Sequence, residues 1–442
     1  MNLPVITLAD ADGRQRFAAL LDRLRSQAAP SGQLARDVAE IIDHVRNRGD
    51  DAVVEYMRRW TSPTYSENLI CVDSADMAAA TDTIDPEVRT ALEKSIDNVR
   101  VYQRHVMPAN PPTLEHDGAE LGMRFTPMRR VGLAVPGGRA AYPSTVIMTA
   151  VPAQVAGVDE LAVVCPPPTA PADADPSHPT DVSPLVLATC HLLGIDEVYR
   201  IGGAQAIAAL AFGTESVAPV DFIAGPGNAF VQQAKRQVFG TVGVDGFYGP
   251  SEVVILADDS ADPAMIAADL LAQAEHDPGC CFLISPDPAV IDRINQQVQA
   301  QLPRRQRRHV IEQALAEWSA AVIAADMAEA LALVDELAAE HVTLAVDQPQ
   351  TALEQLRHGG AWFLGHRTPV ASGDYYAGPS HCLPTGTTAR FTSGISVYTF
   401  LKRSSVEHYP GGPPGQAIDH IAALAEAEGL EAHAASVRAR RG

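Results

Sequence analysis

Three stretches of the sequence carry side chains that could hold a metal ion. In "DLLAQAEHDP" (269–278), Gln273 and His276 stand three residues apart at the end of an expected helix, so they share one helix face. The other two stretches, "ASGDYYAGPSHCLPTG" and "EGLEAH", supply Asp374, His381, Glu428 and His433. Two imidazoles, a carboxylate and an amide oxygen from these stretches suit a borderline divalent ion such as zinc. The spacings match no short metal motif, however, and a lone histidine is more often structural.

A second group could move protons. In "AAEHVTLAV" (338–346), Glu340 and His341 stand where a helix is expected to give way to a strand. A carboxylate beside an imidazole offers two bases of different pKa, although, taken alone, helix-end and strand-start roles explain both residues better. Ser251 in "YGPSEVV" could bind a substrate hydroxyl or amine, but the stretch lacks the G-x-S-x-G elbow of a nucleophile. The "CCFLI" run that Cys280 opens favours a buried strand with inert thiols.

Three glycine-rich turns follow expected strands: "AVPGGRAAYPST", "RIGGAQAIAAL" and "AGPGNAFVQQAKR". Backbone N–H groups exposed in such turns, at the start of a helix, can hold an anion. None is a complete G-x-G-x-x-G, since the nearest ends in Phe230. Each turn alone could serve only chain reversal, but three together favour a nucleotide or phosphate ligand. Arg139 in the first turn could reach a phosphate.

The expected elements change character along the chain. Residues 32–49 and 85–106 show helical spacing of apolar residues. From about residue 130, short apolar strands alternate with helices, which indicates parallel sheets covered by helices. We expect strands at 131–135, 160–165, 198–201 and 220–224, and a second set at 253–257, 281–284, 320–323, 342–346 and 361–365.

The pattern predicts an α/β fold with two similar units that meet near residue 250. We expect the Pro/Ala/Asp-rich stretch 166–184 to be a surface loop without chemistry. The expected domains are an N-terminal helical segment (1–30), a first α/β domain (31–133 with 250–395), a second with the glycine-rich turns (134–249), and a C-terminal helical tail (396–442).

Composition narrows the function classes. The chain has 442 residues, of which 46% are hydrophobic, and a net charge of −21. This charge argues against a nucleic-acid partner or an anionic membrane surface. No apolar stretch approaches a membrane span, the N-terminus lacks a signal pattern, and the six cysteines show no disulfide framework. We therefore expect a cytoplasmic protein.

Taken together, these motifs resemble the histidinol dehydrogenase family. The matching stretches occur in the family's order and cover almost the whole chain. They are "VPGGRAAYPSTV", "GGAQAIAALAFGT", "IAGPGNAFVQQAKRQVFG", "GPSEVVILAD", "AADLLAQAEHDP", "AAEHVTL", "SGDYYAGPSHCLPTG" and "EGLEAH". The resemblance implies two incomplete Rossmann-like domains of the aldehyde-dehydrogenase kind. It also implies oxidation of L-histidinol, through L-histidinal, to L-histidine with two NAD⁺ reduced, at the end of histidine biosynthesis.

The resemblance also assigns residues. It implies one Zn²⁺ per subunit on Gln273, His276, Asp374 and His433. Glu340 and His341 would be catalytic, and Ser251, His381 and Glu428 would contact substrate together with the metal ligands and His341. The NAD⁺ positions fall on Ala134, Gln205 and Asn228, and Ala134 departs from the aromatic residue often found there. Family members are homodimers in which the C-terminal tail reaches the partner's active site.

Other interpretations remain open at this point. The same scaffold could oxidise another amino alcohol or a sulfonate alcohol. A zinc hydrolase could use Glu340 to activate water without a dinucleotide, which leaves the glycine-rich turns unexplained. A hinged two-domain binding protein would explain the architecture, but neither the Glu340–His341 pair nor the scattered metal-type residues.

Overall fold

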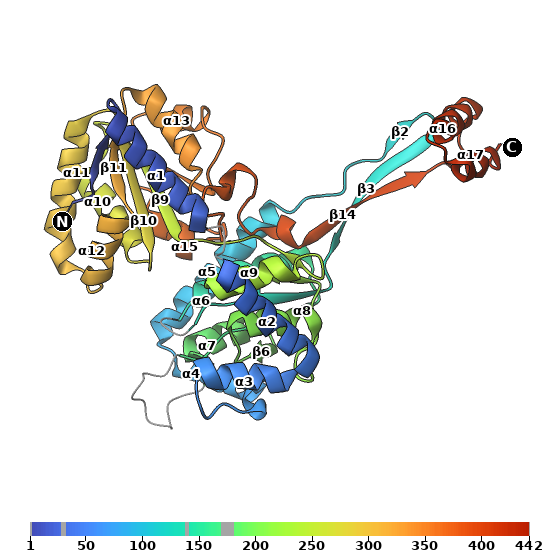
Figure 1. The fold of residues 1–442 in the computed structure, drawn as a ribbon, viewed down its shortest axis with the longest axis horizontal. Helices are drawn as coiled ribbons and strands as arrows, with labels where there is room; N and C mark the ends of the chain where they lie inside the picture. The colour runs from blue at the N-terminus through green and yellow to red at the C-terminus, as the bar shows by residue number, and fades with distance from the viewer. Residues whose placement is uncertain (1, 28–31, 138–140, 169–180, 442) are drawn as a thin grey trace.

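The computed structural model describes residues 2–27, 32–137, 141–168 and 181–441. Two parallel sheets, A and B, each flanked by helices, form a two-sheet body, and a long antiparallel ribbon leads from it to two C-terminal helices (Figure 1). This confirms the predicted α/β class with two parallel-sheet units. Within the described ranges no helix is long and apolar enough to cross a membrane.

Sheet A is entirely parallel, in the order β1-β11-β10-β9-β12-β13. Its central strand β9 is buried on both faces, so its sequence is a continuous apolar run. Val253 and Ile255 point into one core, and Val254 and Leu256 into the other. The strands are β1 (Val5–Thr7), β9 (Ser251–Ala257), β10 (Gly279–Ser285), β11 (Ala320–Ile323), β12 (His341–Ala345) and β13 (Ala361–Leu364).

Helices cover both faces of sheet A. One face carries α10 (Pro263–Ala274), α11 (Pro288–Gln301) and α12 (Arg308–Glu317). The other carries α1 (Ala11–Gln27), α13 (Met327–Leu337) and α14 (Pro349–Leu353). Short helical turns are η1 (Glu67–Leu69), η2 (Leu302–Arg304), η3 (Thr388–Arg390) and η4 (Val397–Phe400), and α15 spans Val370–Tyr375.

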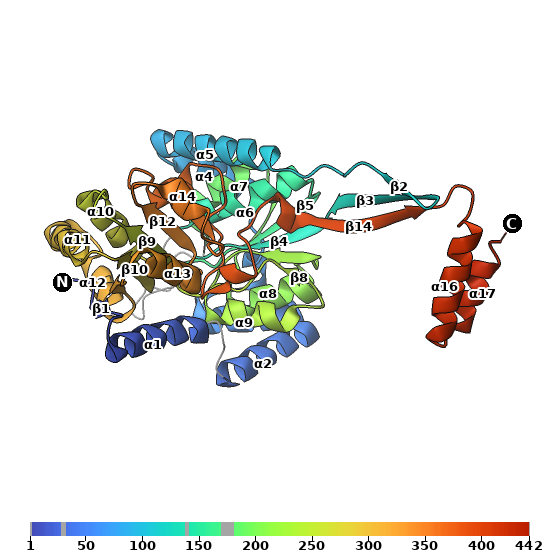
Figure 2. The ribbon, with the colours of Figure 1, turned by 90° about the horizontal axis from the view of Figure 1, so that it is seen from above.

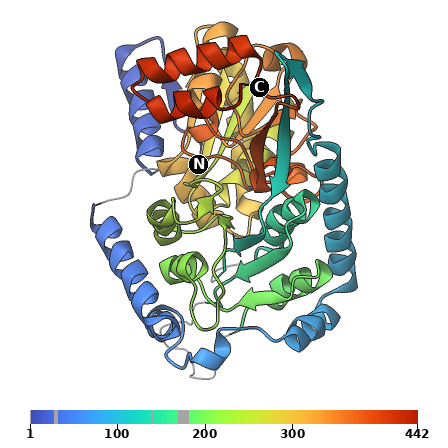
Figure 3. The same cartoon turned by 90° about the vertical axis from the view of Figure 1, so that its right-hand side faces the viewer.

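Sheet B is also parallel, in the order β6-β5-β4-β7-β8. Helices from the first hundred residues pack on both of its faces, as the view along the ribbon shows (Figure 3). The strands are β4 (Arg130–Ala134), β5 (Glu160–Val164), β6 (Glu197–Tyr199), β7 (Phe222–Ala224) and β8 (Gly243–Val244). The helices are α2 (Gly32–Arg48), α3 (Asp50–Trp60), α4 (Ser74–Thr83), α5 (Pro86–His105), α6 (Pro143–Ala156), α7 (Pro184–Leu192), α8 (Gly203–Phe212) and α9 (Ala229–Val238).

A two-part arm projects from the body. Strands β3 (Ala119–Pro127) and β14 (Leu401–His408) pair antiparallel along their length, with β2 (Leu114–His116) at the tip. Beyond them, α16 (Gly415–Ala427) and α17 (Glu431–Arg438) form a hairpin with a small core of its own. This hairpin lies at the far end of the ribbon, away from both parallel sheets (Figure 2). We call the ribbon and hairpin together the arm.

The packing divides the chain differently from the domains we expected. Residues 32–105 pack on sheet B, whereas we grouped 31–133 with 250–395, because amphipathic periodicity does not say which sheet a helix covers. The segment 1–30 is not only helical, since β1 extends sheet A beside β11. The tail begins with strand β14 before its helices.

Candidate functional site

Glu340 and Ser251 form the centre of a hydrogen-bonded row at the amino ends of β9 and β12. The Ser251 hydroxyl donates to Glu340 Oε2 at 2.6 Å, and the Gln273 amide donates to the Ser251 oxygen at 2.8 Å. Glu340 Oε2 also accepts from the backbone N–H of Glu252 at 2.9 Å. Glu340 is 7% exposed. Three predicted site residues from separate elements therefore meet in one polar row.

The His341 ring lies between the Glu252 backbone and the Asp374 carboxylate. Its Nδ1 lies 3.1 Å from the Glu252 carbonyl, which can only accept, so in the neutral ring Nδ1 carries the proton. Its buried Nε2 has no hydrogen-bond partner and lies 3.7 Å from the Asp374 carboxylate. Burial lowers the pKa of His341, but Glu340 and Asp374 outweigh it and raise the pKa to about 9. The site thus favours the imidazolium that forms when Nε2 accepts a proton.

Three of the four predicted metal ligands gather at this edge. Helix α10 ends at Ala274 ahead of Pro278, which places Gln273 Nε2 3.4 Å from His276 Nδ1. Asp374, from α15, has a lowered pKa: burial opposes the shift, while His341, His381 and His276 favour the carboxylate. His381 is half-buried, and its desolvation lowers its pKa. The Asp374 carboxylate is therefore surrounded by imidazoles at this edge.

His433 and Glu428 do not join them within one chain. Glu428 follows α16 and His433 lies in α17, both exposed on the hairpin at the end of the arm (Figures 1 and 2). In the described part of the chain, no group of three or more His, Cys, Asp and Glu is arranged to hold a metal ion. Gln273, His276 and Asp374 offer an amide, an imidazole and a carboxylate, a donor set compatible with zinc but one ligand short of the predicted four.

The predicted dinucleotide positions lie at the carboxyl ends of sheet B strands. Ala134 ends β4 and is buried, with no ring to offer a ligand. Gly225, with φ of 111°, packs so closely on the Ala134 carbonyl that a Cβ would overlap with it. Gln205, in α8, is 3% exposed, and its Oε1 is a buried atom without a partner. Asn228 caps α9 by accepting from the backbone N–H groups of Phe230 and Val231.

The sequence interpretation missed the importance of Glu252. Its backbone contacts both Glu340 and His341, and its own carboxylate accepts from the Gly386 N–H at 2.8 Å. The side chain is fully buried, and this burial raises the pKa of Glu252 to about 8. A carboxylate at the start of the apolar run "EVVILA" was the available signal.

Cys280 and Cys281 are both buried, as expected for a buried strand with inert thiols. Burial raises the pKa of the Cys281 thiol to about 12.

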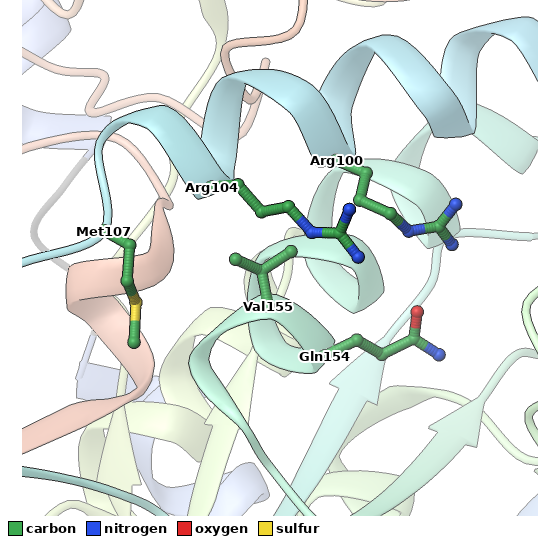
Figure 4. A pocket seen from close by; sticks show the side chains of 5 residues that line it. All are labelled: Arg100, Arg104, Met107, Gln154 and Val155. Carbon is green, nitrogen blue, oxygen red and sulfur yellow. The ribbon is translucent and has the colours of Figure 1, made fainter.

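A separate cavity of about 320 Å³ lies between α5 and α6, and Figure 4 shows its lining side chains. Arg100, Arg104 and Met107 come from α5 and the segment after it, and Gln154 and Val155 from α6. None of the predicted site residues lines it. Arg139 and residues 169–180 of the 166–184 loop lie outside the described residues.

Comparison with known proteins decides the family. The family model described as histidinol dehydrogenase matches residues 24–441. The chain belongs to the histidinol dehydrogenase family. A histidinol dehydrogenase from Mesorhizobium japonicum is 45% identical over 435 residues, covering 98% of each chain. One from a Synechococcus strain is 43% identical over 432 residues, covering 98% of this chain and 97% of the relative.

A solved structure agrees with this membership. Histidinol dehydrogenase from Elizabethkingia anophelis superposes with a TM-score of 0.91 at 28% identity, covering 99% of this chain and 98% of that one. The shared fold therefore includes the arm as well as both sheets. Because relatives of this name are similar to the chain over almost its whole length, we assign it as an oxidoreductase of the histidinol dehydrogenase family.

Proposed function

We propose that this protein oxidises L-histidinol, through L-histidinal, to L-histidine and reduces two NAD⁺, at the end of histidine biosynthesis. The observation that carries the proposal is the Ser251–Glu340–His341 constellation, with Gln273 and Asp374 beside it, on a chain of this family. The relatives' name supplies the substrate, and the site supplies two bases for two oxidations.

In its neutral form, His341 takes the hydroxyl proton of histidinol in the first oxidation, and its pKa of about 9 makes this form more abundant as the pH rises. Its Nε2 has no competing partner, and Asp374 and Glu340 stabilise the resulting imidazolium. NAD⁺, when bound, accepts the hydride that leaves the substrate carbon in each step. Proton transfer by a positioned base typically contributes 10²–10⁴-fold in rate.

Glu340 acts in the second oxidation. Its carboxylate takes a proton from the water that attacks the aldehyde carbon, and His341, after releasing its first proton to solvent, takes a proton from the hydrate. Ser251 and the Glu252 N–H hold Glu340 Oε2, so the other carboxylate oxygen is left for the water. No thiol takes part, in keeping with the buried position of Cys280 and Cys281.

Gln273, His276 and Asp374 would hold a zinc ion, with His433 as the fourth ligand. The ion would anchor and orient the imidazole and amine of histidinol. His381, Ser251 and Glu428 would contact the same substrate. The three donors at the edge of sheet A support this assignment, because an amide, an imidazole and a carboxylate leave positive charge on the ion.

Gln205 and Asn228 would hold NAD⁺ at the carboxyl edge of sheet B. The unpaired Gln205 Oε1 offers a buried acceptor, and the start of α9 offers the positive end of a helix dipole to a phosphate. Ala134 would leave room for the dinucleotide but no stacking contact.

The working form would be a homodimer with exchanged arms. Glu428 and His433 stand at the end of an arm that projects from its own body, so a second copy is the partner they suit. The hairpin exposes Ile421, Leu424 and Leu430, which are 41, 69 and 42% exposed. Such apolar side chains on a separate small unit favour packing against another copy. Each active site would then contain residues of both subunits, in a cytoplasmic enzyme.

The test is the number of NADH formed for each L-histidinol consumed, followed by absorbance at 340 nm. The proposal predicts two NADH for each substrate, with L-histidine as product. One NADH with histidinal released would remove the second step. No NADH, with purified zinc-loaded dimer, would contradict the proposal and favour the hydrolase or binding-protein interpretations.

A further inference from the structure

A buried ion pair lies beneath the third glycine-rich turn. Lys235, in α9, is fully buried and pairs with the equally buried carboxylate of Asp245, after β8. Taking two charges out of water costs several kcal/mol per ion, so such a pair persists only where further hydrogen bonds hold it. Neither residue touches the catalytic row or the predicted zinc ligands, and the proposed steps do not use them.

The pair holds the dinucleotide turn by its backbone. Lys235 Nζ donates to the Gly225 carbonyl at 3.0 Å, and the Gly225 N–H donates to Asp245 Oδ2 at 2.7 Å. Both polar groups of one glycine are therefore bound to one ion pair. Gly225 is also the residue whose missing Cβ lets the turn pack on β4.

The same carboxylate reaches toward the catalytic edge. Asp245 Oδ2 accepts a second hydrogen bond, at 2.7 Å, from the hydroxyl of Tyr248. Tyr248 begins the segment Tyr248–Gly249–Pro250, which leads directly into Ser251. The Gly249 N–H donates to the Thr385 hydroxyl, in the loop that carries His381.

Gln232 makes a parallel connection. Its amide donates to the Gly227 carbonyl at 3.2 Å, and its oxygen accepts from the Tyr248 N–H at 2.9 Å. The dinucleotide turn and the start of the Ser251 segment are thus tied together twice, once through Asp245 and once through Gln232. Lys235 Nζ also lies 4.9 Å from the centre of the Tyr248 ring.

We infer that Lys235, Asp245 and Tyr248 are positioning residues that fix the NAD⁺-binding turn of sheet B relative to the Ser251–Glu340 row of sheet A. The inference rests on the proposed function, since it concerns how two bound reactants are aligned. Hydride transfer needs the reacting carbons in contact, and a displacement of about 1 Å can cost up to 10²-fold in rate. Binding of histidinol alone, or of NAD⁺ alone, needs no such alignment.

The variant Tyr248→Phe tests this. It removes only the hydroxyl that Asp245 accepts and keeps the ring beside Lys235. We expect kcat to fall by about tenfold with the KM values of histidinol and NAD⁺ unchanged. The kinetic isotope effect with histidinol deuterated at its carbinol carbon should increase, because hydride transfer becomes slower than the other steps.

Tyr65→Phe is the matched control. The Tyr65 hydroxyl is also buried and donates at 2.9 Å, to the Arg200 carbonyl, but this contact lies within the sheet B unit and does not connect it to sheet A. This variant should lose stability without any change in kcat. Gln232→Met removes the parallel connection and should lower kcat in the same way, which keeps the test informative if Tyr248→Phe does not fold.

The outcomes separate cleanly. A kcat fall confined to Tyr248→Phe and Gln232→Met supports the inference. An unchanged kcat, an equal loss in Tyr65→Phe, or a rise in the KM of NAD⁺ with kcat preserved overturns it and leaves the proposed function intact. A wild-type dimer that forms no NADH from histidinol overturns the proposed function, and this inference with it.

Discussion

Sheet A presents the amino ends of its strands to the candidate site, whereas sheet B presents the carboxyl ends of its strands. The edge of sheet A is rich in side-chain chemistry: Ser251 and His341 begin β9 and β12, with a carboxylate and an amide beside them. The edge of sheet B consists mainly of turns, in which Gly225 packs on the Ala134 carbonyl and α9 begins with the positive end of its dipole.

The difference indicates a division of tasks. Side chains with shifted pKa values, such as His341 and Glu252, lie on sheet A, where proton transfer is proposed. The positive end of the α9 dipole, suited to a dinucleotide phosphate, lies on sheet B. Changes at the first edge should act on the chemical step, and changes at the second edge on NAD⁺ binding.

Metal removal should have the largest effect. A chelator should abolish histidinol oxidation, and zinc should restore it, because the proposed ligands Gln273, His276 and Asp374 all lie on the sheet A side. NAD⁺ binding, followed by calorimetry on the same metal-free protein, should be unchanged. Weakened NAD⁺ binding in the metal-free protein would show that the two edges are not separate in function.

Glu340→Gln should come next. Loss of the base that activates water should lower the rate of histidinal oxidation by about 10²–10⁴-fold, with the KM of NAD⁺ unchanged. Stopped-flow measurement of NADH from histidinal gives this rate. Glu354→Gln, on an exposed helix end of the same sheet unit, is the control and should match the wild type. Equal activity of both variants would exclude Glu340 from catalysis.

Gly225→Ala should act on the other edge. Its new Cβ would overlap with the Ala134 carbonyl, so the turn must shift, and the KM of NAD⁺ should rise by about tenfold or more. Gly240→Ala is matched for backbone strain, with φ of 103° and nothing near its Cβ. Steady-state kinetics should show the KM effect only in Gly225→Ala. The same rise in both variants would attribute it to general strain.

Glu252→Gln should have the smallest effect, on stability. Burial raises the pKa of Glu252 from 4.5 to about 8 in the folded protein, so its stabilising contribution is present below pH 4.5 and lost as the pH rises toward 8. The glutamine does not titrate. The Tm of the variant relative to wild type should therefore rise by roughly 2 °C between pH 4.5 and pH 8. A constant difference in Tm across this range would contradict the raised pKa.

The sequence predicted most strands of both sheets, because buried parallel strands such as "VVILA" and "VTLAV" are continuous apolar runs between turns. It did not predict the short edge strands β1 and β8. It did not predict the ribbon. Strand β14 is exposed along nearly its whole length, and its sequence "LKRSSVEH" has no apolar face to reveal it. It also did not assign α2–α5 to sheet B, which depends on long-range packing.

The candidate site could be predicted in part. Glu340, His341, Gln273 and Asp374 were named from motifs and resemblance, and the structure brings them together through tertiary contacts that no local pattern contains. Lys235 gave no signal, because a lysine in an amphipathic helix normally faces solvent. His433 was named as a candidate ligand, and its place in α17 on the arm separates it from the other three proposed ligands within one chain.

In the proposed dimer, one active site combines the sheet A edge of one subunit with the arm of another. Mixing two inactive variants, Glu340→Gln and His433→Ala, after joint unfolding and refolding tests this exchange of arms. With exchanged arms, a mixed dimer has one site that is intact in both residues, so about a quarter of wild-type activity should return. If each arm serves its own body, no site regains both residues, and the mixture would stay inactive.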